Sequence, residues 1–124
     1  MASELTGVLQ IAIPGKDIER ATVFYRDTLG LRFLMNGPNM AFFDCGGIRI
    51  YLDANPGMVE AGKNSMIYFR TGNVERAHCA FQERGVTIHQ SPHIIASLPD
   101  RDVWLMWIRD SEQNLLGVME ERPK

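Results

Sequence analysis

Residues 10–31 read QIAIPGKDIERATVFYRDTLGL, and residues 66–86 repeat the same order of features as MIYFRTGNVERAHCAFQERGV. The Glu19-Arg20-Ala21 segment returns at residues 75–77, and Gly30 returns as Gly85 after one deletion. Internal self-similarity of this kind indicates a structural unit that is present twice. The repeat therefore predicts a single domain, residues 1–124, made of two modules at about residues 6–55 and 62–121.

Each copy of the repeat has the pattern of a strand followed by a helix. Asp17 and Asn73 are placed to cap the two helix N-termini, and Gly30 and Gly85 are placed to end the helices. Apolar and β-branched runs bounded by turn residues predict four strands in each copy. These strands lie at residues 8–14, 31–35, 40–44 and 48–52, and at residues 65–70, 86–90, 103–109 and 115–120. The order is βαβββ twice, which is an α+β fold.

We expect the eight strands to form one cupped mixed sheet with the helices on one face. In the first strand Ile11 and Ile13 alternate with Gln10, so Gln10 faces the inside of the cup. The same alternation turns Met66 and Tyr68 into the cup in the second copy. Residues 91–102 are left as a long connection, and connections of that length are often functional.

Composition excludes several classes of partner. Thirteen Lys and Arg against fifteen Asp and Glu give a net charge of −2, so the chain lacks the basic surface that binds nucleic acid. No apolar run approaches the ~20 residues of a membrane span. Cys45 and Cys79 have no CxxC spacing, and the N-terminus lacks the pattern of a signal peptide. We therefore expect a cytoplasmic protein with reduced thiols, and no nucleic-acid or membrane partner.

The opening motif and the closing motif together resemble a known superfamily. The ERATVFYRDTLGL segment of residues 19–31 and the RDSEQNLLGVME segment of residues 109–120 are similar to the vicinal oxygen chelate superfamily. That superfamily holds glyoxalase I, extradiol dioxygenases, methylmalonyl-CoA epimerase, fosfomycin-resistance enzymes and bleomycin-binding proteins. The 110–114 turn departs from the family's Asp-Pro-x-Gly-Asn. The resemblance implies a tandem βαβββ fold and a homodimer with its cavity close to the interface.

Catalytic members of this superfamily usually hold one divalent metal in the cup. The resemblance places the ligand positions at Gln10, Met66 and Gly117, with a fourth at Tyr51 or Ile50. A thioether and a glycine do not supply the oxygen or imidazole ligands that hard and borderline divalent ions require. We therefore expect no resident metal and predict no cofactor; Gln10 is the one weak candidate ligand.

Several other residues could serve a bound small molecule. His93 is a candidate general base and Tyr68 a candidate proton donor, although loop histidines and strand tyrosines are more often structural. Arg49 and Arg109 could anchor a ligand carboxylate or phosphate, although strand-end arginines are more often solvated. An apolar pocket is predicted to be lined by Gln10, Tyr51, Met66, Trp104 and Met106.

The sequence supports three functional hypotheses. The first is a superfamily protein that binds a small, partly apolar molecule, with lyase, isomerase or dioxygenase-like chemistry left open. The second is a non-enzymatic, drug-sequestering dimer similar to the bleomycin-binding proteins. The third is a metalloenzyme with unusual ligands, namely Gln10, His93 and Tyr51.

Overall fold

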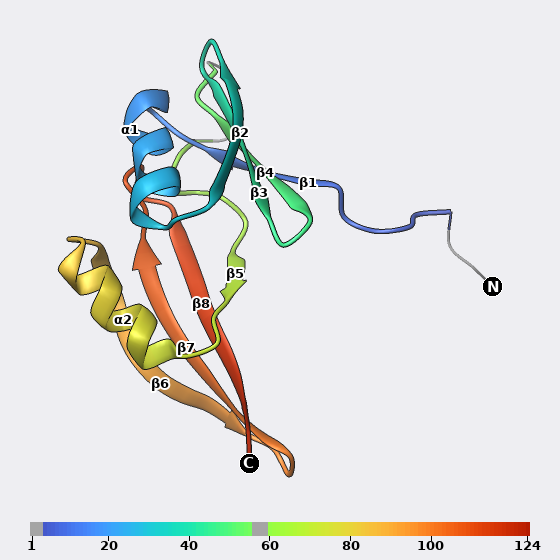
Figure 1. Cartoon of the computed structure of the whole chain (residues 1–124), viewed down its shortest axis with the longest axis vertical. Coiled ribbons are helices and arrows are strands. Elements are labelled where there is room, and N and C mark those ends of the chain that lie inside the picture. The colour runs from blue at the N-terminus through green and yellow to red at the C-terminus, as the bar shows by residue number, and fades with distance from the viewer. Residues whose placement is uncertain (1–3, 56–59) are drawn as a thin grey trace.

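The computed structural model describes residues 4–55 and 60–124 and contains two consecutive βαβββ units (Figure 1). The linker predicted between the modules lies partly outside the described residues. The first unit contains β1 (Gln10–Pro14), α1 (Ile18–Val23), the π-helical turn η1 (Phe24–Thr28), β2 (Arg32–Gly37), β3 (Met40–Cys45) and β4 (Ile48–Asp53). The second unit contains β5 (Ile67–Arg70), α2 (Val74–Glu83), β6 (Thr87–Ser97), β7 (Arg101–Arg109) and β8 (Leu115–Pro123).

The eight strands form two four-stranded mixed sheets. Their orders are β1-β4-β3-β2 in the first unit and β5-β8-β7-β6 in the second. β1 runs parallel to β4 and β5 parallel to β8, whereas the other neighbouring strands are antiparallel. The α+β class and the eight strands agree with the sequence prediction. The difference is that the strands are divided between two sheets, one in each half of the chain.

The predicted helix ends are confirmed. The Asp17 carboxylate accepts hydrogen bonds from the backbone N–H groups of Glu19 and Arg20, both at 3.1 Å, and the Asn73 side chain accepts one from Arg76 N at 2.9 Å. Gly30 and Gly85 adopt φ angles of 77° and 76°, in the left-handed region that ends helices and favours glycine. The repeated sequence therefore encodes the same boundaries in both units.

One continuous hydrophobic core joins the two units. Tyr25 and Phe43 of the first unit belong to the same buried cluster as Met106, Ile108 and Leu116 of the second. A unit of about sixty residues that folds alone buries only about 60% of the surface of its unfolded chain, less than a domain of twice that length, and is marginally stable. The shared cluster therefore makes the stability of each unit depend on the other.

Glu112 in the 110–114 turn of the second unit reaches into the first unit. Its carboxylate, only 1% exposed, accepts hydrogen bonds from the backbone N–H groups of Lys16 and Asp17 and from Arg20 Nε, all at 2.7 Å. Burial by itself would raise the pKa of Glu112, but these donors outweigh it and hold the pKa below its usual range. The buried carboxylate thereby fixes the start of α1 against the second unit.

Asp110 and Asn114 of the same turn add a second set of buried contacts between the units. The Tyr25 hydroxyl donates to Asp110 Oδ2 at 2.6 Å, and Asn114 Nδ2 donates to the Pro14 carbonyl at 2.7 Å. Burial first, and then the charge of Asp110, raise the pKa of Tyr25 well above its usual value, so the phenol stays protonated and donates. The turn at residues 110–114, which departs from the family motif, thus holds the two units together through buried hydrogen bonds.

Residues 91–102 were predicted as a long connection, and this prediction is wrong. β6 continues through Ser97, and β7 begins at Arg101 after a short turn. The register of β6 on β7 shifts at three places, which interrupts the alternation by which a strand is recognised from sequence. Pro92 is tolerated because β6 is an edge strand of its sheet.

Among the described residues, no helix is long and apolar enough to cross a membrane. The cytoplasmic location remains a prediction from the sequence.

Candidate functional site

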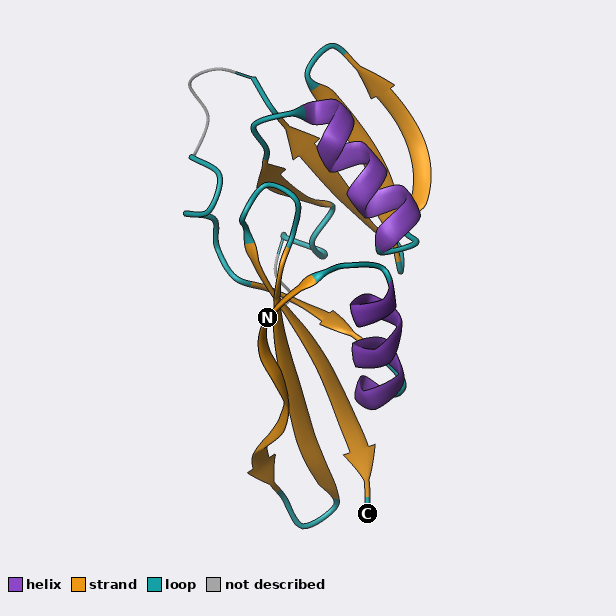
Figure 2. Cartoon of the chain, turned by 90° about the vertical axis from the view of Figure 1, so that its left-hand side faces the viewer, coloured by secondary structure: helices purple, strands orange, loops and turns teal. Residues whose placement is uncertain are grey.

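Both helices lie on the same side of the molecule, and the opposite side of each sheet carries no helix (Figure 1). Figure 2, in which this side faces the viewer, shows the helices one above the other along the long axis. We call the helix-free sides of the two sheets the free faces. Strand alternation and register place on them Gln10, Phe42, Arg49 and Tyr51 in the first sheet, and Tyr68, Arg70, Trp107 and Gly117 in the second.

The free face of the first sheet carries an aromatic stack beside an arginine. The rings of Phe42 and Tyr51 lie 4.9 Å apart between centroids and at 11° to one another. Arg49 donates from Nε to Gln10 Oε1 at 2.7 Å, and its guanidinium lies 5.8 Å from the centroid of the Phe42 ring. This cluster offers a flat apolar surface with polar donors at its edge.

Tyr51 adds a hydroxyl group to this surface. Burial, followed by the interaction with the Asp53 carboxylate, raises the pKa of Tyr51. The phenol is therefore protonated at neutral pH and can donate a hydrogen bond.

The free face of the second sheet carries two aromatic rings above a glycine. Tyr68 and Trp107 meet edge to face, with ring centroids 5.2 Å apart. Both are register neighbours of Gly117, and a Cβ atom at Gly117 would lie 2.8 Å from Tyr68 Cδ2 and 3.2 Å from Trp107 Cζ3. A side chain at this position would therefore displace at least one of the two rings.

The residues at the family's metal positions do not fit a divalent metal. The position of the last-strand carboxylate is Gly117, and the rings of Tyr68 and Trp107 cover it. Met66 offers a thioether, and the amide oxygen of Gln10 is already hydrogen-bonded to Arg49. In the described part of the chain, no group of three or more His, Cys, Asp or Glu side chains is arranged to hold a metal ion.

His93 and Tyr68 share the free face of the second sheet but lie on opposite edges of it. Tyr68 is on β5 and His93 is on β6, and two strands separate them. Three strand spacings of ~4.8 Å put the two side chains about 14 Å apart. His93 Nδ1 lies 3.0 Å from the Ser91 carbonyl oxygen. The two candidates therefore cannot exchange a proton directly.

Trp104 and Met106 were predicted to line an apolar pocket with Gln10 and Tyr51, but both lie on the core side of their sheet. Met106 is fully buried in the shared core, and Trp104 packs against the same core with its ring 4.8 Å from the Arg122 guanidinium. β7 carries large apolar residues on both faces, and Trp107 is the tryptophan that reaches the free face. Met66 precedes β5 and is 57% exposed.

Phe42, Trp107 and Gly117 are the site residues that sequence reasoning missed or left without a binding role. Two-residue hairpin turns fix the register of the strands that they join. Gly46 and Gly47, both with positive φ, form such a turn between β3 and β4, and counting outward from it pairs Phe42 with Tyr51. The signal for this aromatic stack was therefore present in the sequence.

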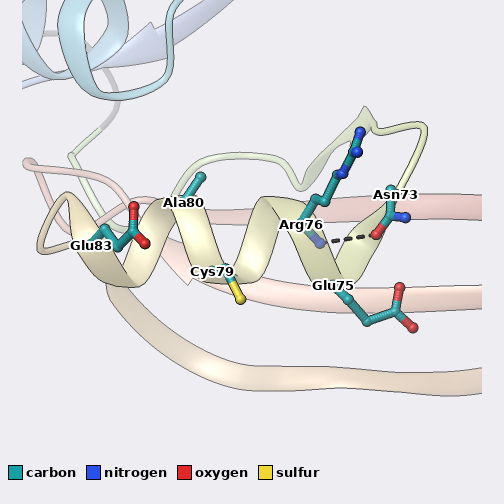
Figure 3. Close-up of a pocket in the computed structure, with 6 residues that line it drawn as sticks. All are labelled: Asn73, Glu75, Arg76, Cys79, Ala80 and Glu83. Carbon is teal, nitrogen blue, oxygen red and sulfur yellow. Dashed lines mark hydrogen bonds between the residues drawn. The ribbon is translucent and has the colours of Figure 1, made fainter.

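Two other hollows lie on the helix side. A cleft of about 680 Å³ between the units has apolar walls that include Ile11, Leu31, Ile67, Phe69 and Phe81. A second hollow is the open surface of α2 around Cys79, Arg76 and Glu83 (Figure 3). The first is wide enough for a ligand, and its lining also includes Tyr68 and Arg70, which lie on the edge strand β5 and so border both the cleft and the free face.

Comparison with known proteins is consistent with this fold. The "Uncharacterized protein YraH" of Bacillus subtilis (strain 168) is 27% identical over 128 residues, which cover 90% of this chain and 95% of the relative. Metallothiol transferase FosB of Staphylococcus epidermidis is 25% identical over 114 residues, which cover 90% of this chain and 65% of that protein.

Among solved structures, TnmS3, an antibiotic binding protein from Streptomyces sp. CB03234, superimposes with a TM-score of 0.76 at 24% identity. The superposition covers 97% of this chain and 99% of that one. A family model described as the glyoxalase/bleomycin resistance protein/dioxygenase superfamily matches residues 7–115. The tandem βαβββ fold and this match over most of the sequence lead to one conclusion: the chain belongs to the glyoxalase/bleomycin resistance protein/dioxygenase superfamily.

Proposed function

We propose that the protein binds a planar, partly apolar small molecule on its free faces and holds it without a resident divalent metal. The observation that carries the proposal is the pair of rings, Tyr68 and Trp107, at the position where the family places a metal-binding carboxylate. Aromatic rings bind flat apolar ligands through their faces and edges. The stacked Phe42 and Tyr51 offer the same kind of surface in the other unit.

The proposal extends to a homodimer. Large apolar side chains are exposed on the free faces and on the edge strands β2 and β6. Exposed large apolar side chains are frequent at protein interfaces. We propose that a second copy of the chain covers this surface and closes the ligand site. The side chains concerned are Met35 (59% exposed), Met66 (57%), Tyr68 (50%), Ile95 (48%) and Ile94 (47%).

The ligand is proposed to be held unchanged, as in the sequestering hypothesis. The separation of His93 from Tyr68 speaks against the two acting as an acid–base pair. TnmS3, which shares the fold, is an antibiotic binding protein, and FosB is a metallothiol transferase. The rings of Tyr68 and Trp107 over Gly117 favour binding, as described for TnmS3, over metallothiol transfer, as described for FosB. A catalytic role for His93 or Tyr68 remains a prediction from the sequence.

A thermal-shift screen tests this function. Planar aromatic compounds, including aromatic antibiotics, are expected to raise the melting temperature by several degrees, whereas 2-oxo acids without a ring leave it unchanged. Mass spectrometry is expected to recover the bound compound chemically intact, and the chelator EDTA is expected to leave the shift unaltered.

Two leucine variants locate the binding surface in the same screen. Trp107→Leu removes a ring that lies on the free face and does not line the cleft, and we expect it to abolish most of the ligand-induced shift. Phe81→Leu removes a ring from the cleft on the helix side and is expected to preserve the shift, measured against the variant's own melt. If Phe81→Leu loses the ligand-induced shift and Trp107→Leu retains it, binding on the free faces is contradicted. A ligand that binds only after a metal is added would contradict the metal-free site.

A further inference from the structure

The charged residues on the free faces are mostly arginines, although the chain as a whole has a net charge of −2. The register of the strands assigns each of them to its face. Within the described strands, the free faces carry Arg32, Arg49, Arg70, Arg101 and Arg109 against Asp44, Asp53 and Glu121. The surplus of positive charge therefore lies where the aromatic pairs are.

Of the three carboxylates on these faces, Glu121 and Asp53 bind other residues, whereas Asp44 lies opposite Arg32 and Arg49 in the strand register without an ion pair to either. Glu121 accepts from Arg101 Nε at 2.8 Å, and Asp53 is 4% exposed and accepts from the backbone and side chain of Asn55. No carboxylate of residues 4–55 or 60–124 forms an ion pair with Arg49 or Arg70. Two guanidinium groups are therefore available to an anion that comes from outside.

Each available arginine lies beside an aromatic pair. Arg49 is two residues from Tyr51 on the same face, and it is oriented by its bond to Gln10 and by the Phe42 ring. Because Nε is the atom that donates to Gln10, the terminal nitrogens remain free to donate to a ligand. Arg70 is two residues from Tyr68, which corresponds to about 7 Å along the strand. The two units thus present the same combination of rings and unpaired guanidinium.

We propose that the ligand is a planar aromatic anion, such as an aryl carboxylate, and that Arg49 and Arg70 select it by its negative charge. A guanidinium donates two parallel hydrogen bonds to a carboxylate, which adds orientation to the attraction. A neutral or cationic ligand on the same rings would take an arginine out of water without supplying an anion, which is unfavourable. This inference rests on the proposed function, because it specifies the ligand class of the same site.

Three probes of one shape but different charge test the inference. Anthracene-carboxylate is an anion, anthracene-methanol is neutral and anthracene-methylamine is a cation. We expect isothermal titration to show that the wild-type protein binds the carboxylate roughly tenfold or more tightly than the alcohol. Raising the salt concentration is expected to reduce this preference, because salt screens attraction between partly exposed charges.

Arginine variants identify the residues that recognise the charge. Arg49→Met and Arg70→Met are each expected to lower affinity for the carboxylate by about tenfold and to leave affinity for the alcohol nearly unchanged. Arg49→Lys keeps the positive charge but cannot form bidentate hydrogen bonds to a carboxylate, so we expect it to retain part of the affinity for the carboxylate. The matched control is Arg76→Met, on the surface of α2 (Figure 3), which is expected to bind all three probes as the wild type does.

The outcomes separate this inference from the proposed function. If the alcohol or the amine binds as tightly as the carboxylate, and Trp107→Leu weakens that binding, the inference is wrong and the proposed site stands. If the preference for the carboxylate survives both Arg49→Met and Arg70→Met, the inference is also wrong. If none of the three probes binds, both proposals are overturned.

Discussion

Glu112→Gln is expected to lower the free energy of unfolding at pH 7 by about 3 kcal/mol, the largest effect we predict for a single polar substitution. Urea denaturation of the purified variant measures it, as a decrease in the midpoint with an unchanged slope. The change replaces one oxygen by an amide nitrogen of similar size. Because the substitution leaves packing nearly constant, the decrease in the free energy of unfolding measures the contribution of the charge and its hydrogen bonds.

The expected size follows from the surroundings of this carboxylate. Glu112 is 1% exposed, and Oε1 and Oε2 accept from Lys16 N, Asp17 N, Arg20 Nε and the Ser111 hydroxyl. In the variant the amide NH₂ group replaces either Oε1, which accepts from Lys16 N and Asp17 N, or Oε2, which accepts from Arg20 Nε and the Ser111 hydroxyl, so at least two donors lose their acceptor. An unsatisfied buried polar group costs about 1–3 kcal/mol, and hydrogen bonds to a charged group are the stronger kind.

The dependence of this effect on pH has a definite sign. The pKa of folded Glu112 lies below its unfolded value because the donors outweigh the effect of burial. The contribution of Glu112 to the free energy of unfolding is therefore complete above the pKa of the unfolded state, about 4.3. It is lost as the pH falls through the lower pKa of the folded state. The difference between wild type and Glu112→Gln is expected to be constant from pH 7 to about pH 5 and to narrow in stronger acid.

Glu121→Gln is the matched control. Glu121 also pairs with an arginine, Arg101, but its side chain is 53% exposed. Exposed ion pairs contribute little to stability, so this variant is expected to unfold at nearly the wild-type midpoint. Two results would contradict the role assigned to the buried carboxylate. One is an equal decrease in the free energy of unfolding in Glu112→Gln and Glu121→Gln. The other is a decrease in Glu112→Gln that stays the same in strong acid.

The repeat was sufficient to predict most of the fold. The caps at Asp17 and Asn73 and the glycines at Gly30 and Gly85 act locally, so the sequence around each of them is enough to place a helix end. β6 was predicted too short because its irregular pairing with β7 depends on the partner strand, which no local pattern records. For the same reason, the division into two sheets could not be read from strand propensities.

The candidate site was predicted less well, because a face of a sheet is defined by register. β7 alternates between Trp104 and Met106 on one face and Leu105 and Trp107 on the other, and both sets are apolar. Hydropathy alone therefore could not decide which set faces the ligand. Glu112 was not identified at all, since a glutamate in a polar turn is exposed in most proteins. Its burial results from contacts with residues some ninety positions earlier in the chain.

Gly117→Val is expected to weaken binding of the best ligand from the screen by roughly thirtyfold, or about 2 kcal/mol. A Cβ at this position would lie 2.8 Å from Tyr68 Cδ2 and 3.2 Å from Trp107 Cζ3, so the rings must move away from the surface that they form together. Valine is favourable in a β-strand, so the backbone of β8 is expected to persist. Titration calorimetry measures the loss, and near-ultraviolet circular dichroism is expected to report the separation of the two rings.

Gly72→Val is the control for Gly117→Val. Gly72 precedes α2, and a Cβ there would meet no atom within 4 Å. This variant gains the same side chain without touching the aromatic pair, so it is expected to bind as the wild type does. Retained affinity in Gly117→Val, together with an altered aromatic dichroism signal, would show that the Tyr68–Trp107 pair is not the binding surface. The ligand site would then have to be sought around Phe42 and Tyr51 alone, the other aromatic surface on the free faces.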